Sequence, residues 1–328
     1  MLRKFSLSSY SIFIVIFSVY AILFSEFNAE KCEPAGLNKT CSCGKCFPGL
    51  FCNKSEICTI DIGSCISHQW IDGKWKPKCE IDGTYSPVQC KGEFLNGRCF
   101  CYNSTGSRIF GWSWWKFAEN MTCSCSLHSE KLSIDREDVS LHCAENGNYE
   151  EMQCDNGLCW CVEPMSGKPT QRVYPESMMT YLPCYNKRNI GYKYLRQCES
   201  KSVARAKLLK RLKYHGHEFF NVEKVFCDKD GTYGYYNING KYIQCSWKDG
   251  KRIDIYQAEI KNIKNINCNC ARDSIIFAES KVEFRSTCSS NGNYDFLQNT
   301  NEYPFCIDSD GFFTGKIGNI GEELTCNG

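Results

Sequence analysis

The hydrophobic pattern places its longest apolar stretch at the start of the chain. Residues 11–24 form an apolar run behind Arg3 and Lys4, and small or polar residues follow up to Ala29. This order is typical of a signal peptide, here at residues 1–29. At its widest, the apolar stretch covers residues 7–24, which is nearly the length of a membrane span. An uncleaved signal anchor is therefore the alternative. Both interpretations place the remaining chain outside the cytosol. If the signal peptide is cleaved, we expect no contact between the mature chain and a membrane.

Beyond this segment, helical composition is clearest at residues 200–214, which contain Ala, Lys, Leu and Arg without Pro or Gly. Four apolar residues at helical spacing predict a buried stripe there: Val203, Leu208, Leu209 and Leu212. Residues 132–141 and 275–284 are weaker helix candidates. Residues 65–79 leave no room for a long helix, because they enclose Gly73 and Pro77.

A short motif, Cys-x-x-x-Gly-[Thr/Asn]-Tyr, occurs four times along the chain. Its copies begin at Cys79, Cys143, Cys227 and Cys288. Asp or Asn precedes each glycine, and such pairs readily form turns with positive φ, so the tyrosine that follows opens a strand. Four copies in phase with the cysteines predict four repeats of one small module.

The cysteine content indicates how such modules are stabilised. All 26 cysteines follow residue 30, and an even number outside the cytosol predicts disulfides rather than free thiols. Modules of this size are not stable on hydrophobic burial alone. Sequons predict glycosylation at Asn38, Asn53, Asn103 and Asn120. The net charge of +2 gives no overall field that would select a nucleic acid.

The first two repeats continue in the same way after the motif tyrosine. Repeat 1 continues with Gln89-Cys90 and Cys99-Phe100-Cys101, and repeat 2 with Gln153-Cys154 and Cys159-Trp160-Cys161-Val162. This order resembles the thyroglobulin type-1 family, whose signature is a Tyr, a Gln-Cys and a Cys-Trp-Cys-Val followed by Gly. Repeat 2 matches it closely. Repeat 1 has Phe100 and Tyr102 in place of Trp and Val but keeps Gly106.

The resemblance implies small disulfide-rich α+β modules in tandem, each with one helix beside a short antiparallel sheet. It implies ten disulfides: Cys65–Cys79, Cys90–Cys99, Cys101–Cys123, Cys125–Cys143, Cys154–Cys159, Cys161–Cys184, Cys198–Cys227, Cys245–Cys268, Cys270–Cys288 and Cys306–Cys326. The predicted organisation is a loop-rich, cysteine-rich knob at 30–60, repeats at 65–123, 125–184, 198–268 and 270–326, and a basic linker at 185–197. Single residues separate repeat 1 from 2 and repeat 3 from 4, so we expect two rigid pairs on one hinge.

Repeats 3 and 4 depart from the signature at the middle disulfide. Counting from the motif tyrosines puts Ile238 and Ile243 in its two slots in repeat 3, and Asn299 and Pro304 in repeat 4. Both partners are lost together, as expected for bonded cysteines. An Ile–Ile contact offsets part of the lost stabilisation, so we predict that repeat 4 is the looser of the two.

The sequence offers little for catalysis, and we expect neither an enzyme nor a cofactor. The five histidines lie outside any recognisable triad or metal-ligand motif: His68, His128, His142, His215 and His217. Every cysteine is assigned to a disulfide, so no thiolate nucleophile is spare. Cys41, Cys43 and Cys46 have the spacing of a zinc knuckle, but six cysteines behind a signal peptide favour disulfides in the knob.

Residues 185–213 form a basic segment with ten Lys or Arg and one acid, Glu199. One interpretation is a patch that binds a sulfated glycan or an anionic membrane. The other is the solvated face of a helix together with its linker.

The resemblance also implies a function. Some thyroglobulin type-1 proteins, the thyropins, inhibit papain-like cysteine proteases, and a few inhibit aspartic proteases. Three loops form a wedge that blocks the active-site cleft without offering a cleavable strand. We therefore predict a secreted protease inhibitor, with a cathepsin L-like protease as the favoured target. The alternative is a non-inhibitory extracellular binding, adhesion or growth-factor-carrier protein.

In repeat 1 the wedge loops map to residues 70–75, 91–98 and 103–109, and in repeat 2 the second and third map to 155–158 and 163–168. Aromatic anchors are frequent hot spots. The candidate contact residues are Trp70, Asp72, Trp75, Phe94, Leu95 and Asn96 in repeat 1, with Asp155 and Asn156 in repeat 2. A sugar on Asn103 would sit on the third loop of repeat 1 and block docking.

Overall fold

The computed structural model describes residues 33–41, 44–47, 49–61, 63–70, 75–136, 140–191, 193–217, 225–300, 302–319 and 323–326. The predicted signal peptide lies outside the described residues. The chain divides into two units, Met1–Ile62 and Gly63–Gly328. Within the described residues, no helix has the length and apolar character that a membrane span requires.

The first unit contains the cysteine-rich knob. Strand β1 (Leu50–Cys52) pairs antiparallel with β2 (Cys58–Ile60). Two disulfides join the loops around this hairpin, Cys41–Cys52 and Cys46–Cys58. The sulfurs considered as zinc ligands at Cys41 and Cys46 are therefore engaged in disulfides. Cys32 and Cys43 lie outside the described residues.

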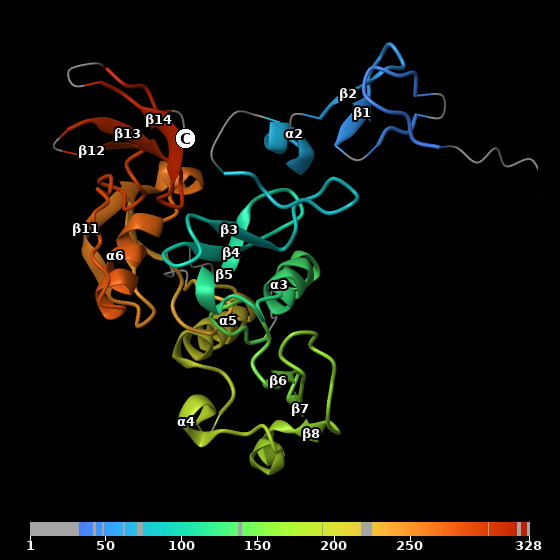
Figure 1. Ribbon diagram of the computed structural model, residues 1–328. Coiled ribbons are helices and arrows are strands. Elements are labelled where there is room, and N and C mark those ends of the chain that lie inside the picture. The colour runs from blue at the N-terminus through green and yellow to red at the C-terminus, as the bar shows by residue number, and fades with distance from the viewer. Residues whose placement is uncertain are drawn as a thin grey trace, which may run out of the picture. The chain divides into compact units, whose positions relative to one another are not determined.

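In the second unit each repeat has a helix followed by a three-stranded antiparallel sheet (Figure 1). Repeat 1 comprises α2 (Cys65–Trp70), β3 (Val88–Lys91), β4 (Arg98–Tyr102), β5 (Arg108–Trp114) and the 3₁₀ helix η1 (Trp115–Phe117). Repeat 2 comprises α3 (Ser124–Asp135), β6 (Met152–Asp155), β7 (Leu158–Cys161), β8 (Tyr174–Pro175) and η2 (Glu176–Tyr181). Repeat 3 follows α4 (Lys187–Ile190) and comprises α5 (Gln197–Tyr214), β9 (Tyr236–Asn239), β10 (Tyr242–Ser246), β11 (Arg252–Glu259) and η3 (Ile260–Asn265). Repeat 4 comprises α6 (Asn269–Glu279), β12 (Leu297–Asn299), β13 (Pro304–Ile307) and β14 (Phe313–Ile317).

The disulfide framework confirms the predicted fold class. All ten disulfides that the resemblance implies for the repeats are present. The described part of the chain has no free cysteine. The second unit is thus a tandem array of small disulfide-rich modules.

The turn motif has the same role in all four repeats. Its cysteine and tyrosine form an isolated β-bridge, as between Cys79 and Tyr85. Each tyrosine ring packs on a glycine with positive φ, in the pairs Tyr85–Gly106, Tyr149–Gly167, Tyr233–Gly250 and Tyr294–Gly311. A Cβ at any of these glycines would crowd the ring, so the site requires glycine. Repeats 3 and 4 therefore keep the centre of the module although each lacks one disulfide.

Helices α3 and α6 begin earlier than the sequence predicted. They start at Ser124 and Asn269, directly after cysteines with φ of 58° and 52°, Cys123 and Cys268. A left-handed residue redirects the backbone, so the next helix begins immediately after the last cysteine of the preceding repeat. The predicted ranges 132–141 and 275–284 therefore overlap only the ends of these helices.

Helix α5 lies where the sequence predicted it, but its buried stripe was predicted wrongly. Val203 and Leu208 are 38% and 53% exposed. Cys198 is the one buried residue of the helix, since its disulfide to Cys227 attaches only the first turn to repeat 3. The rest of α5 presents most of its side chains to solvent.

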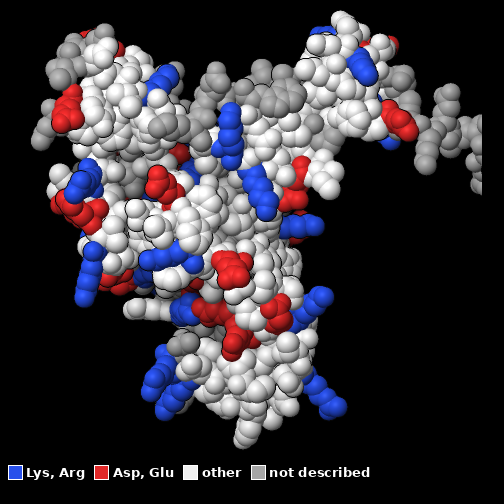
Figure 2. All heavy atoms as spheres, viewed as in Figure 1, with Lys and Arg blue, Asp and Glu red and all other residues white. Residues whose placement is uncertain are grey.

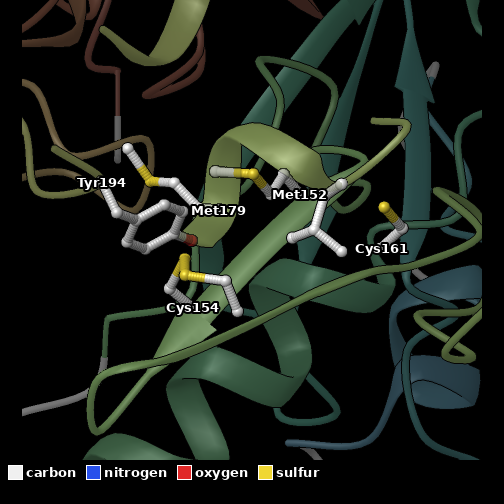
Figure 3. Packing of buried hydrophobic residues seen from close by; sticks show 7 residues of the cluster. Met152, Cys154, Cys161, Met179 and Tyr194 are labelled. Carbon is white, nitrogen blue, oxygen red and sulfur yellow. A yellow bond between two sulfur atoms is a disulfide. The ribbon is translucent and has the colours of Figure 1, made fainter. Parts of the chain in front are cut away.

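The segment predicted to be a flexible linker packs against repeat 2. Tyr194 is 2% exposed and lies in an apolar cluster with Met152 and Met179 (Figure 3). Its ring stacks on His142, with 4.1 Å between centroids, and its hydroxyl donates to the side-chain oxygen of Gln153 at 3.3 Å. These contacts fix the segment, so the structure differs from the predicted hinge.

Contacts between distant repeats also depart from the predicted arrangement of two separate pairs of repeats. The guanidinium of Arg98 in repeat 1 donates to both carboxylate oxygens of Asp273 in repeat 4, each at 2.7 Å. In repeat 3, Lys248 pairs with Glu145 of repeat 2 at 2.8 Å. Residues 63–328 therefore pack as one unit.

Candidate functional site

Residues 92–97 connect β3 to β4, and we call them the tip loop. Among the predicted contact residues whose side chains the structure describes, the most exposed apolar ones lie on this loop. Phe94 and Leu95 are 60% and 70% exposed. The Phe94 ring meets Trp115 edge-on, with 6.4 Å between centroids. The backbone amide of Asn96 donates to the carbonyl of Glu93 at 3.1 Å. The tip loop thus presents two apolar side chains on a folded backbone.

Both ends of the tip loop are tied together. Strands β3 and β4 pair so that Cys90 lies opposite Cys99 and Lys91 lies opposite Arg98. The two cysteines form a disulfide. Lys91 and Arg98 are only 5% and 2% exposed, and two cations buried to this extent require compensating charges.

Repeat 4 supplies these charges. Lys91 Nζ lies 2.7 Å from a carboxylate oxygen of Asp308 and 2.6 Å from one of Asp310. Asp310 also accepts hydrogen bonds from Arg108 at 2.7 Å and from the Tyr102 hydroxyl at 2.9 Å. Six charged residues therefore form what we call the ion cluster: Lys91, Arg98, Arg108, Asp273, Asp308 and Asp310.

The electrostatics of the ion cluster keep Asp310 ionised. Burial by itself raises the pKa of the Asp310 carboxyl, but the nearby charges of Arg108 and Lys91 outweigh that effect. They hold the pKa of Asp310 below its ordinary value. This cluster was not predicted from the sequence. The feature of the sequence that belongs to this cluster is the acidic pair Asp308 and Asp310 in the third loop of repeat 4. In the structure this pair lies opposite basic residues of repeat 1.

The first predicted loop contributes Trp75 at the base of the tip loop. Its indole Nε1 donates to the carbonyl of Cys90 at 2.8 Å, and Lys91 Nζ lies 4.4 Å from the ring centroid. This is a cation–π contact in a half-buried setting. Trp75 therefore supports the tip loop rather than projecting from it. Asp72 and the side chain of Trp70 lie outside the described residues.

The third predicted loop of repeat 1 does not lie beside the tip loop. In the β4–β5 pairing Arg98 is opposite Trp114, whereas Tyr102 is opposite Arg108. Residues 103–107 therefore leave the far end of β4, roughly 13 Å from Arg98 at about 3.3 Å per residue, whereas the Arg108 side chain at the start of β5 reaches the ion cluster. The segment beside the tip loop instead begins at Trp115, whose amide donates to the carbonyl of Gly97 at 2.9 Å.

In repeat 2 the second loop is a tight polar turn. Asn156 and Gly157 have φ of 50° and 76°, as a two-residue hairpin turn requires. The Asp155 carboxylate receives two hydrogen bonds from Arg136, each at 3.0 Å. Leu158 is 47% exposed and is the apolar residue of this turn. Repeat 2 thus has a smaller apolar tip than repeat 1.

A further position, three residues after the first cysteine of a repeat, connects the helix to the turn motif. In repeats 1 and 2 a histidine there shares a hydrogen bond with the motif tyrosine: His68 with Tyr85 and His128 with Tyr149. In repeat 4 Asp273 takes this position and accepts from the Tyr294 hydroxyl at 2.6 Å. Asp273 therefore bonds both its own repeat and Arg98. These three residues could have been found in the sequence by their common spacing, three positions after the first cysteine of each repeat.

Other candidate ligands and bases have contacts that support the fold. His142 is buried, and its Nε2 lies 2.8 Å from a carboxylate oxygen of Glu199. In the described part of the chain, the group that could hold a metal ion is Cys41, Cys46 and Cys58, whose sulfurs are in disulfides.

The predicted glycosylation sites differ in exposure and remain predictions. Asn38 and Asn120 are exposed, and Asn53 is half-buried. Asn103 is also half-buried, and its side-chain nitrogen donates to Glu130 at 3.1 Å.

The basic segment at residues 185–213 is partly engaged within the protein. Arg196 pairs with Glu150 at 2.5 Å, whereas Lys207, Lys210 and Arg211 on α5 are exposed. Figure 2 shows Lys and Arg interspersed with Asp and Glu over the visible face of the second unit. Binding of a sulfated glycan by this segment remains a prediction.

Comparison with known proteins agrees with the geometry of the first two repeats. The family model for the thyroglobulin type-1 repeat matches residues 62–116 and 129–177. U20-hexatoxin-Hi1a from Hadronyche infensa is 33% identical over 98 residues, which cover 28% of this chain and 63% of the toxin. Equistatin from Actinia equina is 32% identical over 99 residues, which cover 26% of this chain and 40% of equistatin.

Thyroglobulin itself is also similar over a short part of its length. The rat protein is 28% identical over 98 residues, which cover 27% of this chain and 4% of thyroglobulin. The chain thus spans less than two thirds of each of these relatives. The two segments that the family model matches fall in repeats 1 and 2, which keep all three disulfides. By these matches the chain contains two thyroglobulin type-1 repeats, and the two modules that follow share their motif tyrosine–glycine contact.

Proposed function

We propose that this chain is a secreted inhibitor of papain-like cysteine proteases that acts mainly through repeats 1 and 2. At the level of the family, the repeats and relatives such as equistatin support a role of the protease-inhibitor type. The observation that carries the proposal is the tip loop, which exposes Phe94 and Leu95 on a base held by a disulfide and the ion cluster. The many disulfides support an extracellular location.

Inhibition by this loop requires no chemistry from the inhibitor. Phe94 and Leu95 enter the apolar part of the protease cleft, where burial contributes about 25 cal/mol per Å². Because the Cys90–Cys99 disulfide already holds the backbone, binding loses little ordering entropy. The amides of Asn96 and Gly97 both bond back to the Glu93 carbonyl, so the loop is a closed turn rather than an extended strand ready for cleavage.

Repeat 1 is the principal inhibitory module in this proposal, and repeat 2 is secondary. Trp75 and Trp115 flank the base of the tip loop and provide further contact surface beside the cleft. In repeat 2 only Leu158 projects from the corresponding turn. The favoured target is a cathepsin L-like protease.

Titration of the purified, oxidised protein against a cathepsin L-like protease tests the proposal, with an aspartic protease in parallel. We expect tight inhibition of the cysteine protease that is lost on reduction. The double variant Phe94→Ala/Leu95→Ala should weaken inhibition by about 100-fold, since two hot-spot residues are removed. The matched control is Ile81→Ala, which removes a 96% exposed apolar side chain of repeat 1 outside the loops.

Two results would contradict the proposal in different ways. Inhibition that survives the double variant would assign the contact to another surface of the chain. No inhibition by either the glycosylated or the deglycosylated protein would favour a non-inhibitory extracellular binding role.

A further inference from the structure

We infer that repeat 4 acts as an internal clamp that positions the tip loop of repeat 1, so that full inhibition requires the C-terminal repeat. This inference rests on the proposed function. It concerns Lys91 and Arg98, which hold the loop in place, and not the residues that touch a protease.

The two ends of the tip loop are both anchored on repeat 4. Lys91 precedes the tip loop and Arg98 follows it, and both side chains end on repeat 4. Lys91 bonds Asp308 and Asp310, and Arg98 bonds Asp273, which lies 175 residues later in the sequence. Arg98 also donates to the backbone carbonyl of Asp310 at 3.1 Å. Each end of the loop is therefore bonded to repeat 4 independently.

The charges of repeats 1 and 4 balance each other in the ion cluster. The ion cluster holds three cations from repeat 1 and three carboxylates from repeat 4, so it is neutral as a whole. The side chains of Arg98 and Asp273 are 3% and 2% exposed. Separating the repeats or neutralising one partner leaves buried charges without compensation, which proteins tolerate poorly. The cluster therefore couples the loop ends to the presence of an intact repeat 4.

The tip loop also packs directly against repeat 4. Gly92, the first residue of the tip loop, has φ of 84°, and a Cβ there would lie 2.9 Å from the Phe312 ring. On the neighbouring strand Phe100 meets the same ring edge-on, with 6.0 Å between centroids. Phe312 thus lies against the start of the tip loop, and the close approach requires glycine there.

The packing of Phe312 against repeat 1 indicates a different role for the third loop of repeat 4, which contains Gly311. Gly311 corresponds to Gly106 of repeat 1, because each supports the motif tyrosine of its repeat. The loop that contains Gly311 also carries Asp308 and Asp310, and Asp310 is 1% exposed. This loop is therefore turned onto repeat 1, where a protease does not reach Asp310. Repeat 4 serves the inhibitory loop of another repeat instead of forming its own wedge.

The test uses the full chain and three single variants. Asp310→Asn removes the charge that Lys91 and Arg108 share, and Asp308→Asn removes the more exposed partner, at 25% side-chain exposure. The control is Asp228→Asn, which breaks a 2.6 Å ion pair with Arg272 that includes no residue of the tip loop or the ion cluster. Amide hydrogen exchange of residues 92–97 and inhibition of a cathepsin L-like protease are measured for each.

We expect Asp310→Asn to accelerate exchange in the tip loop by at least about tenfold and to weaken inhibition by roughly tenfold, as loss of preorganisation predicts. Asp308→Asn should shift both readouts less, in the same direction. Asp228→Asn should shift neither, which separates loop positioning from general destabilisation. If Asp310→Asn does not fold, Asp308→Asn carries the test.

Unchanged exchange in the tip loop of a folded clamp variant would overturn the inference. Faster exchange with unchanged inhibition would also overturn it, because positioning would then not matter. If the unaltered protein inhibits no protease, the proposed function fails, whereas the exchange measurement still decides whether repeat 4 positions the loop.

Discussion

Ile238 and Ile243 lie opposite each other across the β9–β10 hairpin, in the register that Cys90 and Cys99 occupy in repeat 1. Ile243 is fully buried, and Ile238 packs against the same cluster. An apolar contact thus replaces a covalent bond at this point of the module. The sequence count that placed these residues in the disulfide slots is confirmed. The greater looseness of repeat 4 remains a prediction.

Restoring the disulfide should stabilise repeat 3. We expect Ile238→Cys/Ile243→Cys to form a bond, because the cysteine pairs at this register have Cα atoms 4.0 Å apart. Closing so short a loop contributes roughly 2 kcal/mol, and lost isoleucine packing offsets about half of it. Thiol titration and denaturation with and without reductant measure both effects. The single variant Ile243→Cys should be destabilised by about 1 kcal/mol, and a double variant with two free thiols would contradict the prediction.

The pKa of Asp310 predicts where acid weakens the contact between repeats 1 and 4. Its folded-state pKa lies below the ordinary value of 3.8, so its stabilisation is complete above that pH. Below pH 3.8 the unfolded chain binds the proton first, and stability falls as pH falls toward the folded-state pKa, by up to about 1.4 kcal/mol per pH unit. Two facing groups, Lys91 and the Tyr102 hydroxyl, have pKa values raised above their ordinary ones, so both keep their protons in this range.

Denaturation of the unaltered protein and Asp310→Asn at several pH values checks this. The contribution of Asp310 is the difference between the two proteins. It should be constant from pH 7 to about 4.5 and should decline only below 3.8. A decline centred near pH 6 would show that another group controls the contact.

Tyr194 should contribute strongly to the stability of repeat 2. Its side chain is 2% exposed against Met152 and Met179, so Tyr194→Ala should cost about 3–5 kcal/mol in unfolding free energy. Tyr181→Ala is the matched control, because this tyrosine is 75% exposed and its loss should change stability by less than about 0.5 kcal/mol. Equal effects in chemical denaturation would mean that residues 185–197 behave as a free linker after all.

A sugar on Asn103 should leave inhibition unchanged, because Asn103 follows Tyr102, the end of β4 farther from the tip loop. Thr105→Ala removes the sequon while keeping the Asn103 bond to Glu130. We expect the inhibition constant of this variant to stay within about twofold of that of the glycosylated protein. An increase in inhibition of tenfold or more would place the third loop in contact with the protease.

Much of the module could be predicted from the sequence, because its determinants are local in the chain. The turn before Tyr85 needs only an Asp-Gly pair and a nearby cysteine, and these stand within seven residues. The slots at Ile238 and Ile243 follow from counting along one hairpin, since strand register is set by the turn. The ten disulfides of the repeats are those that the resemblance to the thyroglobulin type-1 family implies.

Tertiary structure alone decided which repeats pack together and which loop is presented. Arg98 and Asp273 are 175 residues apart in the sequence, and their side chains meet only because repeats 1 and 4 pack together. Tyr194 became core because its segment folds back onto repeat 2. Leu208 of α5 shows the opposite case, because this apolar residue at a predicted core position is 53% exposed. Local patterns specify each module, whereas complementary charge and shape between modules specify their assembly, and no spacing along the chain encodes that complementarity.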